Sequence, residues 1–323
     1  MTAAPLHDTL ALVPQGGQAH WITTSDGVRL RLAHWNATAA KGTVFLLPGR
    51  TEYIEKYGDA VRHLHAAGYE VLVIDWRGQG LSDRALPDPH KGHVGAMSEY
   101  QIDLRAMRSF GAGMHLPQPW FVLSHSMGGA IALRHLIDAD KIPAEAPLTD
   151  GAPRFKAAAF SAPMFGISLP AAKVLGALAN ALSNSPLRTA YAPGTNRRPY
   201  VHTAGFADNL LTRAPDMWAM MISHLIEQPA LTIAGPTCTW IARALRDCLE
   251  MSALPSPDLP ALTALGSHER IVEPQPIRDR MAAWPKGKLI EFADGEHEVM
   301  MAPKAQRDAF LDQVVALFDA HRD

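Results

Sequence analysis

The sequence predicts an α/β fold in which helices flank a mostly parallel sheet and an all-helical cap is inserted into it. Strand-like and helix-like segments alternate in the first half of the chain, as they do in parallel sheets covered by helices. Several strand-like segments are wholly apolar, which is typical of strands buried on both faces. The alternation stops near the middle of the chain and later resumes. We therefore expect an α/β core of residues 1–163 and 255–323, and a helical cap of residues 164–254.

The first half of the chain supplies most of the expected sheet. Residues 20–35 are predicted to form two strands joined at Ser25-Asp26-Gly27, a typical hairpin turn. Residues 43–48 form a short apolar strand, and the helix that follows ends at Gly68, a residue that favours helix C-termini. The later elements expected here are strands at 70–75, 120–124 and 156–163, and helices at 98–114 and 127–139.

The second half begins with helical patterns and loops that contain no convincing strand. Apolar or amphipathic stretches at 169–182, 209–229 and 236–251 are the expected cap helices. The proline-rich stretch 254–260 then leads back into the core. The last expected elements are strands at 259–266 and 288–292, and helices at 275–284 and 303–321.

Charge and cysteine content exclude several classes of function. The chain of 323 residues has a formal net charge of −2, so it offers no strong field for nucleic acid. Its two cysteines, Cys238 and Cys248, have neither a disulfide framework nor a metal-site spacing. Reduced thiols are typical of the cytoplasm, and we expect the protein to act there.

Motif searches also limit the expected partners. The N-terminal residues lack the charged and apolar regions of a signal peptide, and no apolar run reaches the ~18 residues that span a bilayer. At most a peripheral membrane contact is expected. We find neither a metal-ligand cluster nor a phosphate-binding glycine-rich loop, so we expect no metal and no cofactor. The oligomeric state is left open.

The stretch "SHSMGG", residues 124–129, contains the candidate nucleophile Ser126. It joins an apolar strand to a helix, which is the context of a nucleophile elbow. Such an elbow needs small residues two positions before and after the serine, and Ser124 and Gly128 meet this need. Ser124 replaces the usual glycine and adds only a hydroxymethyl group. The alternative interpretation is an ordinary turn rich in serine and glycine.

A nucleophilic serine needs a base, and the base needs an acid that orients it. In the chain order Ser, Asp/Glu, His, the acid should follow the strand that comes after the cap. Glu269 has this position, with Glu273 and Asp294 as rivals. His297 follows the last strand and is the expected base.

Two main-chain N–H groups are expected to stabilise the oxyanion. One belongs to Met127, directly after the nucleophile, and the other to Arg50, in the loop after the strand 43–48. A competing interpretation gives the Arg50 side chain a phosphate-binding role. Asp75, in the stretch "DWRGQGLSDR", is interpreted as structural because the other residues already complete a catalytic set.

Taken together, the motifs resemble the α/β-hydrolase superfamily, and more narrowly the bacterial lysophospholipases and monoacylglycerol lipases. The resemblance covers nearly the whole chain, cap included, and depends on "LLPGRTEYIEKYGD", "VLVIDWRGQGLSDR", "LSHSMGG", "FADNLLT", "AGPTCTWI", "GSHERIVEP" and "DGEHEVMM". It implies a triad of Ser126, Glu269 and His297, with Arg50 and Met127 in the oxyanion hole. Related proteins usually have His-Gly before the oxyanion loop and Asp as the acid, so this chain departs from the pattern.

The resemblance implies a serine hydrolase that cleaves carboxylic esters through an acyl-enzyme on Ser126. A monoacylglycerol or a lysophospholipid is the expected substrate. Trp218, Trp240 and Met221 are candidates to bind its acyl chain, although cap residues of this kind also pack against the body. The alternatives are a small-ester carboxylesterase, a peptidase or acyltransferase with the same triad, and a non-catalytic binding protein.

Overall fold

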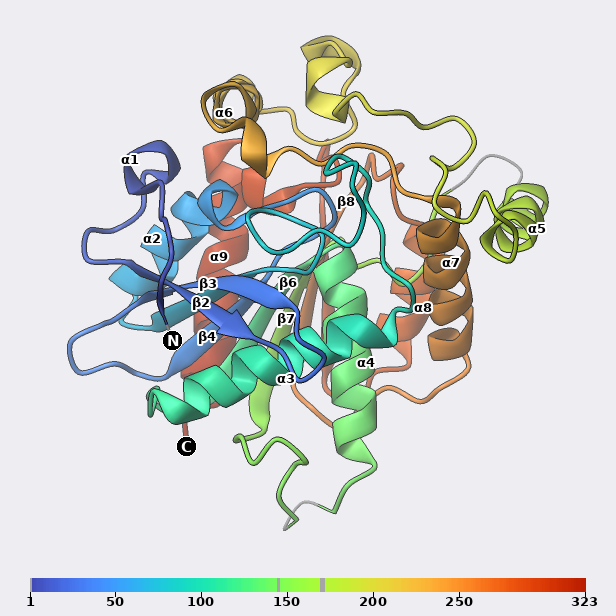
Figure 1. Cartoon of the computed structure of the whole chain (residues 1–323). Helices are drawn as coiled ribbons and strands as arrows, with labels where there is room; N and C mark the ends of the chain where they lie inside the picture. Colours follow the sequence, from blue (N-terminus) through green and yellow to red (C-terminus); the bar gives the residue numbers. More distant parts are fainter. Residues whose placement is uncertain (1, 144–145, 169–171) are drawn as a thin grey trace.

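A nine-stranded sheet forms the centre of the part of the chain that the computed structural model describes, residues 2–143, 146–168 and 172–323 (Figure 1). The strand order is β1-β2-β3-β5-β4-β6-β7-β8-β9. The strands are β1 (Thr2–Ala3), β2 (Gln18–Thr23), β3 (Arg29–Trp35), β4 (Thr43–Leu47), β5 (Glu70–Asp75), β6 (Trp120–His125), β7 (Phe155–Ser161), β8 (Ala261–Gly266) and β9 (Gly287–Phe292).

The sheet is mostly parallel, which confirms the predicted fold class. Strands β1, β2, β3 and β5 pair antiparallel in that order, and the pairs from β5 through β4 to β9 are parallel. Every residue of β4, β5, β6 and β8 is buried, as their continuous apolar runs predict. The two-residue strand β1 and the short helix α1 (Asp8–Ala11) were not predicted from the sequence.

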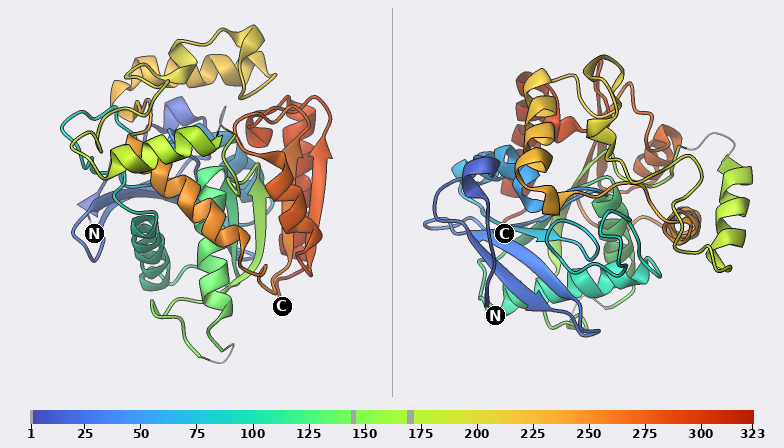
Figure 2. Two further views of the ribbon diagram at one scale, coloured as in Figure 1. Left: turned by 90° about the vertical axis from the view of Figure 1, so that its right-hand side faces the viewer. Right: turned by 45° about the horizontal axis from the view of Figure 1, so that its top comes forward.

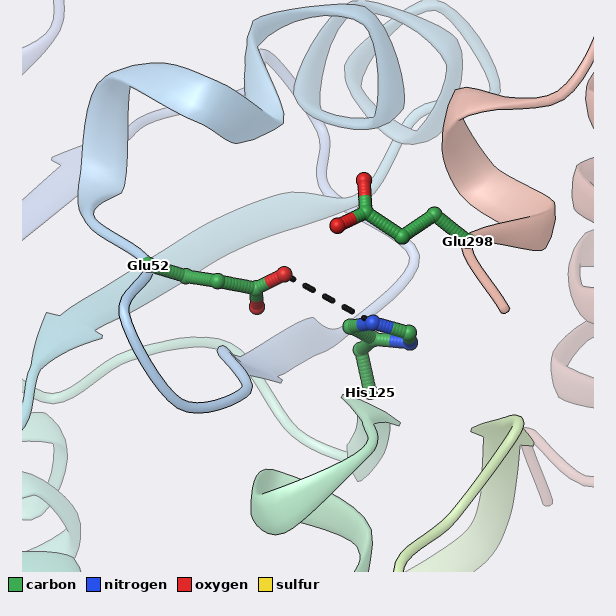
Figure 3. A group of neighbouring side chains, drawn as sticks. All are labelled: Glu52, His125 and Glu298. Carbon is green, nitrogen blue, oxygen red and sulfur yellow. Dashed lines mark ion pairs between the residues drawn. The ribbon is translucent and has the colours of Figure 1, made fainter. Parts of the chain in front are cut away.

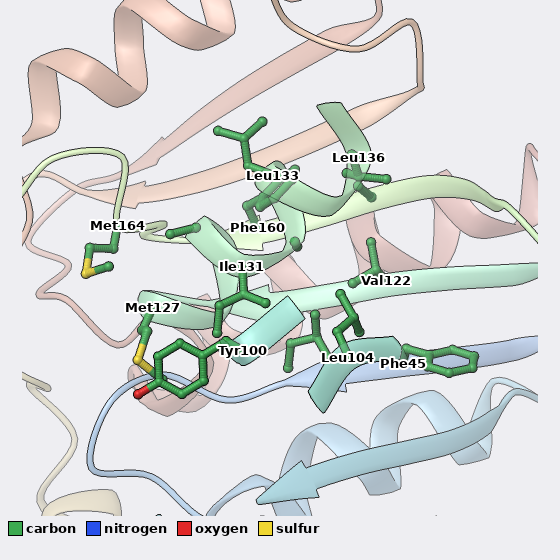
Figure 4. Close-up of a cluster of buried hydrophobic side chains, with 14 of the residues drawn as sticks. Phe45, Tyr100, Leu104, Val122, Met127, Ile131, Leu133, Leu136, Phe160 and Met164 are labelled. Atoms are coloured by element: carbon green, nitrogen blue, oxygen red, sulfur yellow. The ribbon is translucent and has the colours of Figure 1, made fainter. Parts of the chain in front are cut away.

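Helices cover both faces of the sheet. On one face, α3 (Ser98–Gly113), α4 (Met127–Asp140) and α8 (Pro274–Ala282) contribute to a large apolar cluster. Figure 4 shows part of this cluster, in which Tyr100 and Leu104 of α3 lie near Ile131 of α4. On the other face, α2 (Gly58–Ala66) and α9 (Lys304–Asp319) form a second cluster with the sheet. A 3-10 helix, η1 (Ile54–Tyr57), leads into α2.

The segment between β7 and β8 contains α5 (Ala172–Ser183), α6 (Pro215–Glu227) and α7 (Cys238–Ser252). It also contains the 3-10 helices η2 (Tyr200–His202), η3 (Phe206–Asp208) and η4 (Pro229–Leu231). Its described residues form isolated bridges but no strand. The start of the helix expected at 169–182 lies outside the described residues.

The helices of this segment pack against the rest of the protein. In Figure 2, α5 and α7 lie side by side, and α6 lies above the body. Trp240 and Cys248 of α7 belong to the same apolar cluster as α3 and α4. Met217 and Met220 of α6 pack against the other cluster. Because both clusters extend into the body, the position of the segment over the sheet is set by shared packing. Within the described residues, no helix has the length and apolar character needed to cross a membrane.

The aromatic stack on Phe121 yields a stability prediction. The Phe121 ring is fully buried, with its centroid 4.6 Å from that of Phe318 in α9 and 5.8 Å from that of Tyr69. Phe121→Ala leaves a cavity between β6 and α9, and we expect it to lower the free energy of unfolding by about 3–5 kcal/mol. Leu249, with 73% of its surface exposed, is the control position. In urea unfolding, equal losses for Phe121→Ala and Leu249→Ala would contradict this packing.

Candidate active site

Ser126 lies on a sharp turn between β6 and α4. Its backbone angles, φ 50° and ψ −115°, fall in a region that residues other than glycine rarely adopt. A Cβ atom on Gly128 would lie 2.2 Å from the carbonyl oxygen of Leu47 in β4, so only glycine fits there. The Ser124 hydroxyl donates a hydrogen bond to the carbonyl oxygen of Ala159 in β7, at 3.3 Å. The turn therefore accommodates the serine that replaces the usual glycine.

The structure brings Ser126, His297 and Glu269 into one chain of hydrogen bonds. Nε2 of His297 lies 2.9 Å from Oγ of Ser126, and Nδ1 of His297 lies 2.7 Å from Oε2 of Glu269. A carboxylate at Nδ1 favours the tautomer that carries its proton there, which leaves Nε2 free to accept one from the serine hydroxyl.

Main-chain groups hold the longer side chain of the glutamate in place. Oε1 of Glu269 accepts hydrogen bonds from the N–H groups of Ile271 and Val272, at 2.7 and 3.0 Å. The other oxygen is thereby directed at His297. A third side chain in a nucleophile–base arrangement normally acts by orienting the base.

The two rival acids have other surroundings. The Asp294 side chain is 86% exposed and lies 3.9 Å from His268. Glu273 precedes α8, and its carboxylate lies against Gly166. Within the described residues, the hydrogen bonds of His297 involve neither of them. Asp75 is ion-paired with Arg31 at 2.7 Å, in agreement with its interpretation as structural.

The charges in the triad shift two pKa values in opposite directions. Burial lowers the pKa of the His297 imidazole, but the charge and hydrogen bond of Glu269 outweigh burial, and the pKa is raised above its ordinary value. Burial raises the pKa of the Glu269 carboxyl, but the charge of His297 and the hydrogen bonds to the carboxylate lower it overall. The pair therefore favours an ionised glutamate and stabilises the imidazolium that forms when the histidine accepts a proton.

Two main-chain N–H groups near Ser126 have no acceptor among the described residues, as the predicted oxyanion donors require. In the loop after β4, the N–H of Gly49 donates to the Glu52 carboxylate, and that of Thr51 donates to Oε1 of Gln79 at 2.9 Å. The N–H of Arg50, between them, has no acceptor among the described residues. Met127 is the first residue of α4, where an N–H has no partner inside the helix.

A buried charge network, which sequence reasoning missed, supports this loop. Nζ of Lys56 lies 2.6 Å from a carboxylate oxygen of Glu52 and 2.6 Å from one of Glu298. Glu52 also pairs with His125, which precedes Ser126 (Figure 3). The network thus links the loop after β4 to the residues next to Ser126 and His297. The spacing of Glu52 and Lys56, one helical turn apart, is the sequence signal that could have revealed part of it.

Three residues of this network could in principle hold a metal ion. One ligand atom from each of Glu52, His125 and Glu298 lies within 4.8 Å of the others. However, the Lys56 ammonium already contacts both carboxylates. Lys56 offsets one of the two carboxylate charges, burial raises the pKa of the Glu298 carboxyl, and a metal ion would have to compete with Lys56 for both side chains. The arrangement therefore fits an internal ion-pair network better than a metal centre.

A cavity of about 390 Å³ opens above Ser126 and His297. Residues from α6 and α7 and the residues between them line much of it, including Met221, Leu225, Ile233, Trp240 and Ile241. Two of the three expected acyl-binding residues, Met221 and Trp240, thus face this cavity. Trp218 is not among its described lining residues. It is buried instead and packs against the rings of Tyr200 and Phe206.

Comparison with known proteins identifies the family. A family model described as "Serine aminopeptidase, S33" (Hydrolase_4) matches residues 38–304, and the chain belongs to this family. Lysophospholipase L2 of Escherichia coli K12 is 30% identical over 317 residues, which cover 93% of this chain and 86% of that protein. Monoacylglycerol lipase of Mycolicibacterium smegmatis is 30% identical over 193 residues, covering 57% of this chain and 62% of that protein.

A solved structure supports the same fold. A variant of monoglyceride lipase from Saccharomyces cerevisiae, in complex with a substrate analogue, superposes with a TM-score of 0.71 at 16% identity. The match covers 95% of this chain and 96% of the yeast chain. The α/β-hydrolase resemblance predicted from the sequence is confirmed, and the chain is a serine ester hydrolase of that fold.

The raised pKa of His297 generates a pH prediction. Its imidazole must be neutral to accept a proton, so kcat/KM for an ester should rise with pH and then reach a plateau. The midpoint should lie above the ordinary ~6.5 of histidine. Glu269→Gln removes the charge that raises this pKa, and the midpoint should move to lower pH. Turnover in this variant should also fall, by up to ~10⁴ as in triad amide variants.

Asp294→Asn is the matched control, because that carboxylate is exposed and does not contact His297. The measurement is a pH profile of kcat/KM for all three proteins with one p-nitrophenyl ester. If the midpoint shifts in Asp294→Asn and stays unchanged in Glu269→Gln, Glu269 is not the acid that acts on His297.

Proposed function

We propose that the protein hydrolyses the acyl ester of a lipid-like substrate, with Ser126 as nucleophile, His297 as general base and Glu269 as the acid that orients it. The main-chain N–H groups of Arg50 and Met127 form the oxyanion hole. The observation that carries this proposal is the position of the Ser126 hydroxyl, 2.9 Å from an imidazole and at the base of a largely apolar cavity.

The proposed reaction has two half-reactions. Oγ of Ser126 attacks the ester carbonyl carbon while its proton passes to Nε2 of His297, and the carbonyl electron pair moves onto the oxygen held by the two N–H groups. Collapse of this intermediate expels the alcohol, which takes the proton from Nε2. A water molecule then attacks the acyl-enzyme in the same way, and release of the carboxylic acid restores Ser126.

The apolar cavity favours an acyl chain as the group that occupies it. Burial of each methylene contributes about 0.8 kcal/mol, so a cavity lined by Met221, Leu225 and Ile241 binds a chain better than a polar group. The names of the two curated relatives, a lysophospholipase and a monoacylglycerol lipase, agree with this substrate class. An aminopeptidase would need an accessible carboxylate for the substrate's amino group, whereas the lining glutamates Glu52 and Glu298 are buried and contact Lys56.

The cytoplasm is the compartment that we propose for this reaction. Cys238 and Cys248 are both buried free thiols in the structure. Reduced cysteines of this kind are the rule in the cytoplasm, where disulfides are rare.

Chain-length dependence tests the lipid proposal. With p-nitrophenyl esters of increasing acyl length, kcat/KM should rise by about fourfold for each added methylene, the equivalent of ~0.8 kcal/mol, until the cavity is full. Met221→Ala shortens a side chain that lines the cavity, so it should flatten this rise.

Ile226, on the same helix, is 65% exposed, does not line the cavity and provides the control. Ile226→Ala should keep the slope of the parent protein. If the parent shows no rise with chain length, or if both variants keep its slope, a small polar ester becomes the better substrate class.

A further inference from the structure

Arg50 carries a charge that the described part of the protein does not compensate. Its Nη1 donates a hydrogen bond to the carbonyl oxygen of Ala234 at 2.9 Å, and its Cζ lies 5.4 Å from the ring centroid of Trp240. Among the described residues, no carboxylate forms a salt bridge with it. Burial lowers the pKa of the guanidinium to about 10, so the group stays protonated at neutral pH.

Two other arginines without a described carboxylate partner, Arg154 and Arg280, donate more hydrogen bonds to the protein than Arg50 does. Arg154 donates to four main-chain carbonyl oxygens, those of Ala139, Ile142, Pro143 and Ala146. Arg280 donates to the carbonyl oxygens of Leu254 and Met251 and to the Ser256 hydroxyl. These two side chains connect loops to the body. Arg50 makes a single hydrogen bond of this kind and lines the cavity above Ser126, so a purely structural role leaves most of its donors unused.

The other cationic side chains of the cavity are already paired. Lysine and arginine contribute three described lining residues, Arg50, Lys56 and Arg270. Lys56 is held by its two glutamates. Nη2 of Arg270 lies 3.0 Å from both carboxylate oxygens of Glu296, which also pairs with Arg213 at 2.6 Å. Of these three described residues, Arg50 is therefore the one that pairs with no described carboxylate and can bind an anion from outside without displacing one. A partly desolvated cation without a partner is costly unless a ligand supplies the opposite charge.

We propose that the Arg50 guanidinium binds the phosphate group of a lysophospholipid whose acyl ester lies on Ser126. This inference rests on the proposed function, and it selects the phosphate-bearing substrate over the neutral monoacylglycerol. A guanidinium presents a planar set of donors that matches two phosphate oxygens, and Nε and Nη2 can supply them while Nη1 stays on Ala234.

The length of a lysophospholipid suits binding by both the main chain and the side chain of Arg50. The main-chain N–H of Arg50 is proposed to hold the ester carbonyl oxygen, and the side chain of the same residue extends into the same cavity. From the carbonyl carbon to phosphorus, a 1-acyl lysophospholipid has one bond more than the arginine side chain has from Cα to Cζ. The two spans are therefore similar in length, as binding of the ester and the phosphate by one residue requires.

The test compares two substrates that differ only in the phosphate, 1-acylglycerol 3-phosphate and 1-monoacylglycerol, with the same short acyl chain. Arg50→Gln keeps the main-chain N–H and removes the charge. The ratio of kcat/KM for the phosphate substrate to that for the neutral one should fall by about 10- to 100-fold, the usual value of a hydrogen bond to a charged group. Effects on the loop itself cancel in this ratio. Arg50→Lys keeps the charge and should retain part of the preference.

Arg270→Gln is the matched control, because it removes a cavity-lining arginine that already has a carboxylate partner, Glu296. This variant should leave the ratio as it is in the parent protein. A ratio that is unchanged in Arg50→Gln, or that falls as far in Arg270→Gln, overturns the assignment of Arg50 while ester hydrolysis still stands. A parent protein that cleaves neither substrate and no p-nitrophenyl ester contradicts the proposed function instead.

Inhibition of ester hydrolysis by small phosphates shows whether Arg50 binds a lipid headgroup or free phosphate. Glycerol 3-phosphate should inhibit p-nitrophenyl ester hydrolysis competitively in the parent protein, and more weakly in Arg50→Gln. If inorganic phosphate inhibits through Arg50 and the ratio of the two lipid substrates does not change, the site binds free phosphate and the headgroup assignment is wrong.

Discussion

The close approach of the Ser126 turn to strand β4 is the constraint on which the rest of the site depends. Gly128 lies so near the carbonyl oxygen of Leu47 that no side chain fits between them. This contact places the loop after β4, with Arg50, beside the start of α4. The strained backbone of Ser126 costs on the order of 1–3 kcal/mol, and the fully buried β6 between β4 and β7 holds it in place.

A second layer of buried charge connects the parts that this turn brings together. The Glu52 carboxylate accepts a hydrogen bond from the N–H of Gly49, next to Arg50. The ammonium of Lys56 contacts Glu52 and also Glu298, which follows His297 in the chain. Removing one member would leave buried charge uncompensated. The network therefore connects the loop after β4 to the loop that carries His297.

Much of the fold and the central part of the site could be predicted from the sequence, because both depend on local patterns. Continuous apolar runs identify β4 and β5, and the strand–turn–helix context identifies Ser126. Other features depend on contacts between distant segments and have no such local signal. The orientation of Glu269, for example, comes from two N–H groups of its own loop, and the place of Trp218 outside the cavity depends on how α6 packs over Tyr200. Sequence patterns could not reveal that the Arg50 side chain has no carboxylate partner among the described residues, because its surroundings come from residues near Ala234 and Trp240.

Covalent labelling with a fluorophosphonate tests the central claim, that Ser126 is a nucleophile activated by His297, most directly. Intact-mass and peptide mass spectrometry of the labelled protein should show one adduct, on Ser126. The rate of labelling should fall as the pH drops through the titration of His297, and it should be close to zero in His297→Ala. An adduct on a different serine, or labelling of Ser126 that is equally fast without His297, would contradict the account.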